Sequence, residues 1–413
     1  MNEYDDLTTR LTRTLADHSD AMAGSSLGLG DVQGRARSIR RRRTATAVAG
    51  TAAAVALLVP TVALASHTNG THHEPGPATQ TPTSTQTATT ADTNAPLRID
   101  GLTLGEPPAV GYLAGGRIHV SDGGTGTISS VADPVDRFVL LSDGTAVYHT
   151  RDAEGHMSVE VTDSGGSNHG PYAAADGLAV DATRTSAAWV SPDGQVHAWV
   201  ATRTGPVTVG DPVPGTGPQL DAVTGDCSAS CQALVRTTDP GTGEVDDRVV
   251  PLTGAPEQAA PRGPFVTVSD LSTAGGRLGY TDIGQGTSCS AVTEPSGSVS
   301  WRTCRHTLLA FSPDSDYVSA DVDFHSGDGS GTIAAYDGTS GDLLFEHQAT
   351  LKTQASVQST VWEDDTHLLA VVRQGLDWSV VRFGVDGSME LAVAPVKGTD
   401  DLRSPIVLGG ARG

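Results

Sequence analysis

The amino-acid sequence predicts an all-β fold, a β-propeller of about seven four-stranded blades, with six or eight blades as the alternatives. The chain has 49 Gly and 23 Pro among 413 residues, which favours strands and tight turns over helices. From Leu97 onward, short β-rich runs alternate with turn residues, and no long run has a helical period. A hydrophobic share of 37% is enough for a folded core.

The charge of the chain limits its partners. The formal net charge is −22, which argues against nucleic acid or an anionic membrane surface as the main partner. Only Lys352 and Lys397 among the 26 basic residues are lysines, a bias typical of a GC-rich genome.

Residues 1–43 form the first predicted segment, a cytoplasmic helical tail. Leu7, Leu11 and Leu15 recur every four residues and therefore share one helical face. We expect a short juxtamembrane helix, and a docking helix for a cytoplasmic regulator is the alternative. The sole Gly-x-Ser-x-Gly match, residues 24–28, lies in this tail away from any predicted sheet, so we interpret it as chance.

Residues 44–65 are predicted to be a transmembrane helix, which makes the lipid bilayer a partner. Its 22 uncharged residues span roughly 33 Å as a helix, enough to cross a hydrocarbon core of ~30 Å. Arginines precede the segment and no basic residue follows before Arg98, which places the N-terminus in the cytoplasm and the C-terminal domain outside. The alternative is a signal peptide cleaved between Ala65 and Ser66, which would release a secreted domain.

Residues 66–96 are predicted to be a disordered stalk. Thr, Pro, Gln and Ala dominate this stretch, and such a composition buries too little apolar surface to fold. His67, His72 and His73 are candidate metal ligands, but histidines in a mobile polar segment rarely bind a metal, so we expect no metal site.

Residues 97–413 are predicted to form the extracytoplasmic propeller. Turn motifs recur at residues 141–144, 191–194, 226–231, 272–276, 312–315 and 363–365, and we expect each to join the first two strands of a blade. The mean interval is about 44 residues, which matches the ~40–45 residues of a four-stranded blade. Approximate blade starts are Pro108, Arg137, Gly177, Gln219, Phe265, Leu308 and Val357.

The ring is expected to close between its two chain ends, which leaves no long open edge to aggregate. The first unit is short, so we expect it to share a blade with the C-terminus. We also expect a strand near residues 97–104 to pair with the last blade.

These repeats resemble those of the WD40-like and TolB-like β-propellers. The resemblance rests on the turn Ser191-Pro192-Asp193-Gly194 and on the later turn from Asp337 to Gly341, and it covers about three quarters of the chain. It implies a membrane-anchored propeller of the kind found in high-GC actinobacterial envelopes.

All four cysteines lie in the predicted exported body, where oxidation is expected. Cys289 and Cys304 are equidistant from a turn at residues 295–298, so they face each other across a hairpin within disulfide range. Cys227 and Cys231 bracket another tight turn. We predict the pairs Cys227–Cys231 and Cys289–Cys304, one of three connectivities. A redox or haem site is the alternative, and the spacing fits neither.

The exported body contains no recognised catalytic, metal or cofactor motif. It lacks Gly-x-Ser-x-Gly, His-Glu-x-x-His, a P-loop and a dinucleotide fingerprint, so we expect no catalytic residue, no bound metal and no cofactor. Asp321, Asp323 and Asp328 are a candidate Ca²⁺ cluster. Their spacing departs from the Asp-x-Asp-x-Asp-Gly loop, which favours solvated loop acids.

Loops between the second and third strands of each blade are predicted to gather on one acidic rim. We hypothesise that this rim binds a basic protein segment or an envelope glycan, although acids that only maintain solubility are an alternative. The candidate rim residues are Asp152, Glu154, Asp239, Glu244, Asp282, Asp323, Asp328 and Asp377.

The sequence therefore predicts a membrane-tethered, extracytoplasmic propeller that acts as a non-catalytic binding or scaffolding module. One alternative is an envelope sensor that signals through its cytoplasmic helix. The other is a propeller-type hydrolase or lyase, which would require polar residues to converge around a central funnel.

Overall fold

The structure is a computed structural model. It describes residues 93–120, 125–127, 135–201, 203–252, 258–259, 265–282, 288–322, 329–398 and 404–410. All of them lie in one compact unit, Gln86–Gly413. The predicted tail 1–43, the predicted transmembrane helix 44–65 and most of the stalk 66–96 lie outside these ranges. Within them, no helix is long and apolar enough to span a membrane.

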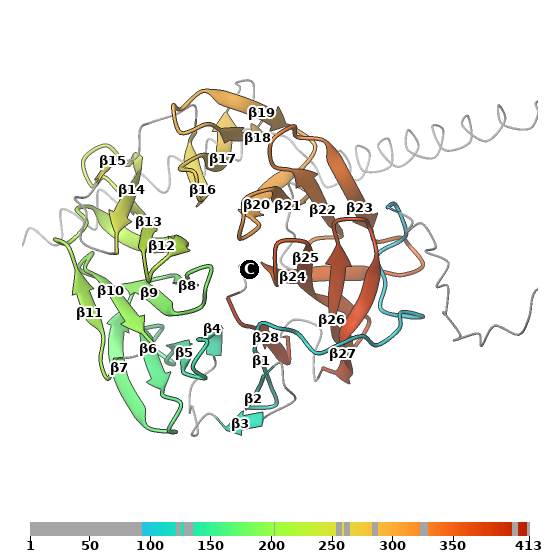
Figure 1. Cartoon of the computed structure of the whole chain (residues 1–413), viewed down its shortest axis with the longest axis horizontal. Helices are drawn as coiled ribbons and strands as arrows, with labels where there is room; N and C mark the ends of the chain where they lie inside the picture. Colours follow the sequence, from blue (N-terminus) through green and yellow to red (C-terminus); the bar gives the residue numbers. More distant parts are fainter. Residues whose placement is uncertain are drawn as a thin grey trace, which may run out of the picture. The chain divides into compact units, whose positions relative to one another are not determined.

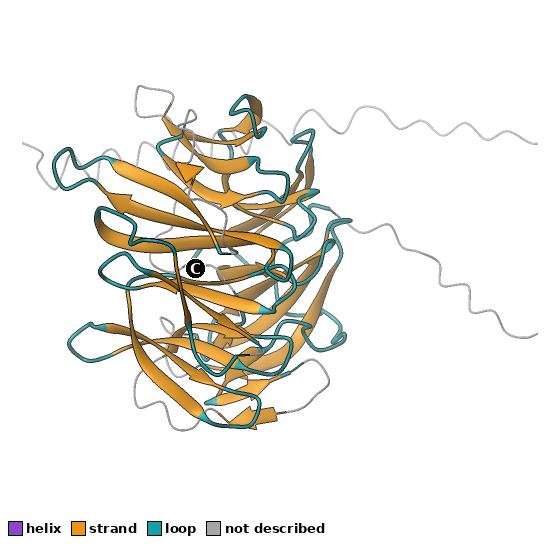
Figure 2. Ribbon diagram, turned by 60° about the vertical axis from the view of Figure 1, so that its left-hand side comes forward, coloured by secondary structure: helices purple, strands orange, loops and turns teal. Residues whose placement is uncertain are grey.

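The described residues form seven four-stranded antiparallel sheets arranged as the blades of a ring (Figure 1). The predicted all-β propeller with seven blades is therefore confirmed. The first strand of each blade lies nearest the axis, and the later strands lie progressively farther out (Figure 1). Figure 2 shows the same blades with strands connected by loops and turns throughout the described part.

Blades 1 to 4 are described from the axis outward. Blade 1 contains β28 (Ile406–Leu408), β1 (Tyr112–Ala114), β2 (Arg117–His119) and β3 (Thr125–Thr127). Blade 2 contains β4 (Val135–Leu140), β5 (Ala146–Arg151), β6 (Met157–Thr162) and β7 (Asn168–Ala174). Blade 3 contains β8 (Leu178–Val180), β9 (Ser186–Val190), β10 (Val196–Val200) and β11 (Val207–Val209). Blade 4 contains β12 (Thr216–Asp226), β13 (Ser230–Thr238), β14 (Val245–Pro251) and β15 (Gln258–Ala259).

Blades 5 to 7 follow the same order. Blade 5 contains β16 (Thr267–Leu271), β17 (Arg277–Asp282), β18 (Ser288–Thr293) and β19 (Val299–Thr303). Blade 6 contains β20 (Thr307–Phe311), β21 (Tyr317–Asp321), β22 (Thr332–Asp337) and β23 (Leu343–Gln348). Blade 7 contains β24 (Ala355–Trp362), β25 (His367–Gln374), β26 (Asp377–Gly384) and β27 (Met389–Lys397).

The core lies between neighbouring blades, so a strand near the middle of a blade is covered on both faces. All five residues of β9 are buried, whereas most residues of the outer strand β7 are exposed or half-buried. This two-sided burial explains why the second strands read as continuous apolar runs rather than alternating ones. Trp189, Trp199 and Trp378 are among the largest fully buried side chains and fill these layers.

Blade 1 closes the ring by combining the two ends of the described chain. The C-terminal strand β28 pairs antiparallel with β1, with Leu113 opposite Val407. The predicted sharing of the first blade with the C-terminus is therefore confirmed. Because β28 is the innermost strand, unfolding either end of the chain removes strands from the same sheet.

The segment predicted to close the ring as a strand near residues 97–104 does so only in part. Residues 93–105, here called the N-terminal strap, pass along blades 6 and 7 and bury Leu97 and Ile99 in the core between them. Leu104 forms one isolated parallel bridge with Leu391 of β27, the outermost strand of blade 7. The strap is therefore a covering segment rather than a blade strand, and ring closure depends on β1 and β28.

The two ends of the ring differ in which connections they carry. Because strands alternate in direction, connections between first and second strands share one end with those between third and fourth strands, and we call it the 1–2 end. Connections between second and third strands share the opposite end with the links from blade to blade, and we call it the 2–3 end.

One predicted turn lies at the opposite end from the one expected. Residues 191–194 join β9 to β10, the second and third strands of blade 3, and so lie at the 2–3 end. The true 1–2 turn of this blade is residues 181–185, where the amide of Arg184 donates to the carbonyl of Asp181. The short strand β8 precedes this turn, and its three residues give little sequence signal, which explains the wrong assignment.

Both predicted disulfides are present. Cys227 and Cys231 lie at the β12–β13 turn with Cα atoms 4.6 Å apart, and Cys289 and Cys304 have Cα atoms 4.1 Å apart. The hairpin register places Ser290 opposite Thr303, so the next pair outward is the second disulfide, as the sequence spacing predicts. Each bond is local to one hairpin and stabilises a single blade.

Candidate functional site

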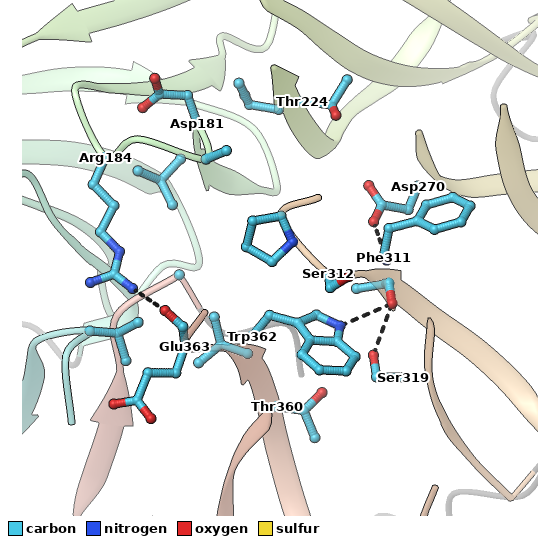
Figure 3. Close-up of a pocket in the computed structure, with 18 of the residues that line it drawn as sticks. Asp181, Arg184, Thr224, Asp270, Phe311, Ser312, Ser319, Thr360, Trp362 and Glu363 are labelled. Carbon is cyan, nitrogen blue, oxygen red and sulfur yellow. Dashed lines mark hydrogen bonds between the residues drawn. The ribbon is translucent and has the colours of Figure 1, made fainter. Parts of the chain in front are cut away.

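The 1–2 end of the ring contains a cavity of about 140 Å³ on the axis (Figure 3). Six blades and the segment before β1 contribute to its wall through innermost strand ends and adjoining turns, while Ser319 comes from the second strand β21. A volume of this size accommodates roughly one benzene-sized group. The apolar part of the wall consists of Val110, Val180, Ala182, Val223, Leu271, Ala310, Phe311, Pro313, Val361 and Trp362.

Trp362 provides the largest aromatic surface in this wall. Its indole Nε1 donates a hydrogen bond to the carbonyl oxygen of Ala310 at 3.2 Å, which connects blade 7 to blade 6 (Figure 3). Ser319 donates to the same carbonyl at 3.2 Å. The ring is therefore held at a fixed angle beside the cavity, with its polar atom already bonded.

Arg184 connects the 1–2 turn of blade 3 to parts of the ring that are not adjacent to that blade. Its guanidinium donates to the carbonyl of Glu363 at 3.1 Å (Figure 3). It also donates to the carbonyl of Ala109 at 2.6 Å. These acceptors belong to the segment before β1 and to the turn of blade 7, so one side chain connects three distant parts of the ring. Burial lowers the pKa of Arg184.

The backbone of Arg184 is in the left-handed region, with φ of 54°. The corresponding turn positions in blades 2 and 5 are glycines, Gly144 and Gly275, each with φ of 86°. A side chain in this conformation costs roughly 1–2 kcal/mol. Arginine therefore occupies a glycine-favouring position, and its contacts across the axis offset that cost.

The carboxylates in the wall are committed to holding the turns. Asp181 accepts hydrogen bonds from the amides of Thr185 and Ser186 in its own turn and of Cys227 in the next blade, at 2.8, 2.8 and 3.1 Å. Asp270 accepts the amide of Phe311 at 2.8 Å and thereby joins blade 5 to blade 6. These bonds make the cavity rim a rigid element.

Glu363 anchors the remaining side of the wall through a nearly buried ion pair with Arg382. Glu363 accepts two hydrogen bonds from Arg382 and one from the amide of Ala109 at 2.5 Å. Arg382 also pairs with Glu390 and donates to the carbonyl of Glu106. The hydrogen bonds from Glu363 raise the pKa of Arg382, which stays protonated.

Acidic turns border the cavity on blades 6 and 7. The amide of Asp314, next to the wall residue Pro313, donates to the carboxylate of Asp365 at 3.1 Å. Repulsion from Asp314 raises the pKa of Asp316 above its ordinary value, with Asp337 and Asp365 adding to the effect. The carboxylates are therefore close enough to repel one another.

The candidate rim acids that fall in described ranges are placed at the 2–3 end. Asp152 accepts a hydrogen bond from the amide of His156, and Asp377 pairs with Lys397 at 2.7 Å. Asp323 and Asp328 lie outside the described residues, and the binding role of the rim stays a prediction. The described members are Asp152, Glu154, Asp239, Glu244, Asp282 and Asp377.

The predicted Ca²⁺ alternative gains no support from the described part. Asp321 is buried at the end of β21, and its proposed companions Asp323 and Asp328 lie outside the described ranges. Within those ranges, no group of three or more His, Cys, Asp or Glu side chains is arranged to hold a metal ion. His67, His72 and His73 also lie outside them.

The sequence did not reveal the cavity. Arg184, Asp270 and Trp362 come from three blades and have no mutual spacing that could mark a site. Part of the signal was present, because the turn from Asp181 to Thr185 follows a short apolar run. The Ser-Pro-Asp-Gly motif at residues 191–194 is the stronger turn signal in this blade, but it joins β9 to β10.

Known proteins are similar to this chain in fold only. No family model and no curated protein sequence matches it. A putative TolB from Agrobacterium tumefaciens is 13% identical, with a TM-score of 0.41, over 62% of this chain and 93% of its own. YCF48 bound to D1 peptide is 11% identical, with a TM-score of 0.42, over 70% and 88%.

A third similar structure is the Cps50 (Swd1) β-propeller domain of Myceliophteria thermophila. It is 11% identical, with a TM-score of 0.44, over 67% of this chain and 90% of its own. At this level of identity the likeness concerns the fold alone, which the sheet topology already establishes.

Proposed function

We propose that this protein is a membrane-tethered, extracytoplasmic binding module that uses the 1–2 end of its propeller and performs no catalysis. The observation that carries the proposal is the axial cavity. Its carboxylates at Asp181, Asp270 and Glu363 already accept backbone or guanidinium hydrogen bonds. The wall therefore offers apolar surface to a ligand, and its acids are engaged in structure rather than in proton transfer.

The rigidity of the cavity favours binding over scaffolding alone. Asp181, Asp270, Arg184 and Trp362 each connect different blades, so the wall is formed before a ligand arrives. A preformed site loses little conformational freedom on binding, which favours affinity.

The extracytoplasmic location rests on two independent features. The uncharged segment 44–65, with arginines before it, has the pattern of a single-pass anchor. The two disulfides are expected in an oxidising compartment outside the cytoplasm.

Proximity labelling in the native cell tests this function. We expect a labelling enzyme fused to the C-terminus to mark extracytoplasmic proteins, and we expect the variant Ala182→Phe, which adds a ring at the cavity wall, to lose one of them. Enrichment of cytoplasmic proteins alone would contradict the orientation. A mature protein that begins at Ser66 would show that residues 44–65 belong to a cleaved signal peptide and that the domain is secreted and not membrane-tethered.

A further inference from the structure

Blades 6 and 7 concentrate acidic side chains at the 1–2 end. Their turns there comprise residues 312–316, 338–342, 363–366 and 385–388, and these stretches contain no Lys or Arg. The exposed acids on or beside these turns are Asp314, Asp316, Asp342, Asp364, Asp365 and Asp386. Among them, Asp364 pairs with His367 at 2.9 Å. The surface therefore carries a large local negative charge.

Some acids of the opposite end pair with Lys or Arg. Asp377 pairs with Lys397 and Asp136 with Arg151, at 2.7 and 3.1 Å. The other lysine of the chain, Lys352, also lies at that end, in the link from β23 to β24. The turns of blades 6 and 7 at the 1–2 end, by contrast, contain no Lys or Arg that could form such a pair within the turn.

The acidic turns and the cavity form one continuous surface. Ser312 and Pro313 line the cavity, and the Ser312 hydroxyl donates to the carboxylate of the next acid, Asp314, at 2.6 Å. Asp365 lies against Asp314 from the turn of blade 7. A ligand that fills the cavity therefore reaches these carboxylates within one or two residues of its chain.

We propose that this end binds a basic polypeptide segment. One apolar side chain of the partner enters the axial cavity, and its flanking Lys or Arg side chains contact Asp314, Asp316 and Asp365. This inference rests on the proposed binding function and specifies its partner.

Cavity chemistry and charge complementarity select this occupant. The wall contains Val, Leu, Phe, Pro and Trp side chains around a volume that fits about one ring or branched aliphatic side chain. A polysaccharide offers hydroxyl groups and lacks a compact apolar group of that size. An acidic segment would add charge where Asp314 and Asp316 already repel each other.

Three peptides test the inference with the full-length protein in detergent micelles. The probes are fluorescent five-residue peptides with a central leucine flanked by two lysines on each side, a version with central serine, and a version with glutamates in place of lysines. We expect the lysine–leucine peptide to bind, and we expect the serine version to bind at least about tenfold more weakly. The glutamate version should not bind.

Matched charge variants locate the binding end. The double variant Asp314→Asn with Asp365→Asn should bind the lysine–leucine peptide about three- to tenfold more weakly, and the salt dependence of the affinity should decrease. Asparagine keeps the carbonyl oxygen that accepts the turn hydrogen bonds, so the fold should persist. Asp152→Asn with Asp377→Asn removes the same charge from the other end and should leave affinity within twofold.

Each other outcome overturns the inference in a recognisable way. Loss of binding only in the Asp152 and Asp377 variant moves the site to the predicted rim. Binding of an envelope glycan in place of any peptide rejects a polypeptide partner. If none of the peptides binds but Ala182→Phe still removes a labelled partner in cells, the proposed binding function is retained and the proposed basic partner is rejected.

Discussion

Replacement of Arg382 by methionine should destabilise the propeller by about 3–5 kcal/mol at neutral pH. The Arg382 side chain is 11% exposed, and the side chain of its partner Glu363 is 4% exposed. Arg382 donates two hydrogen bonds to Glu363, one to Glu390 and two to the carbonyls of Glu106 and Pro107. Its removal leaves a buried carboxylate without its cation, and breaking such a pair costs about this much.

The expected thermal shift follows from the size of the ring. Unfolding entropy is roughly 2.1 cal/mol/K per residue, which gives about 0.6 kcal/mol/K for a propeller of ~300 residues. The melting temperature of Arg382→Met should therefore fall by about 5–8 °C, measured by circular dichroism. Arg151→Met is the matched control, because its pair with Asp136 is 46% and 38% exposed, and it should shift the melting temperature by less than about 2 °C.

A double variant tests the physical reason for this loss. Glu363→Gln added to Arg382→Met removes the unpaired charge, so the double variant should be more stable than Arg382→Met alone. A double variant that loses the sum of the two single effects would refute the argument, as would equal shifts for Arg382→Met and Arg151→Met.

Two further predictions concern the disulfides and a buried histidine. Replacing Cys289 and Cys304 by serine should lower the free energy of unfolding by about 3 kcal/mol in chemical denaturation, and replacing Cys227 and Cys231 should lower it by about 2 kcal/mol. The first loss is larger because the Cys289–Cys304 bond closes the longer loop. Equal losses would contradict a loop-entropy origin. Burial lowers the pKa of His149 from its ordinary 6.5, so its contribution to stability is present above pH 6.5 and is lost as pH falls through the lowered value. His149→Gln should therefore lose less stability between pH 7 and pH 5 than the unchanged protein, and identical pH profiles would exclude this role.

Much of the fold could be predicted because a propeller blade is a local structure. Turn chemistry and strand length are local to one blade, and the blades repeat about every 44 residues. Blades 2 to 7 pair their strands in chain order, and only blade 1 takes a strand from the other end of the chain. The Cys289–Cys304 bond was predictable for the same reason, since a short hairpin fixes which residues face each other. Where the local signal was weak, as in the three-residue strand β8, the turn assignment was wrong.

The axial cavity could not be predicted, because its residues meet only when the ring closes. Arg184, Asp270 and Trp362 belong to blades 3, 5 and 7, and each is unremarkable within its own turn or strand. Their juxtaposition depends on the angle between successive blades, which interblade packing sets. The acidic turns of blades 6 and 7 were visible as sequence, but their position beside the cavity was not.

The sequence by itself determined the blade unit, a count of about seven blades and the two cysteine pairs, because the repeat and the hairpins depend on contacts between residues close together along the chain. Only the tertiary structure decided which residues line the axial cavity, which acids pair with bases and which turn joins the first two strands of blade 3. Those features depend on side chains from blades far apart in the chain, and circular closure is what brings them within a few ångströms of one another.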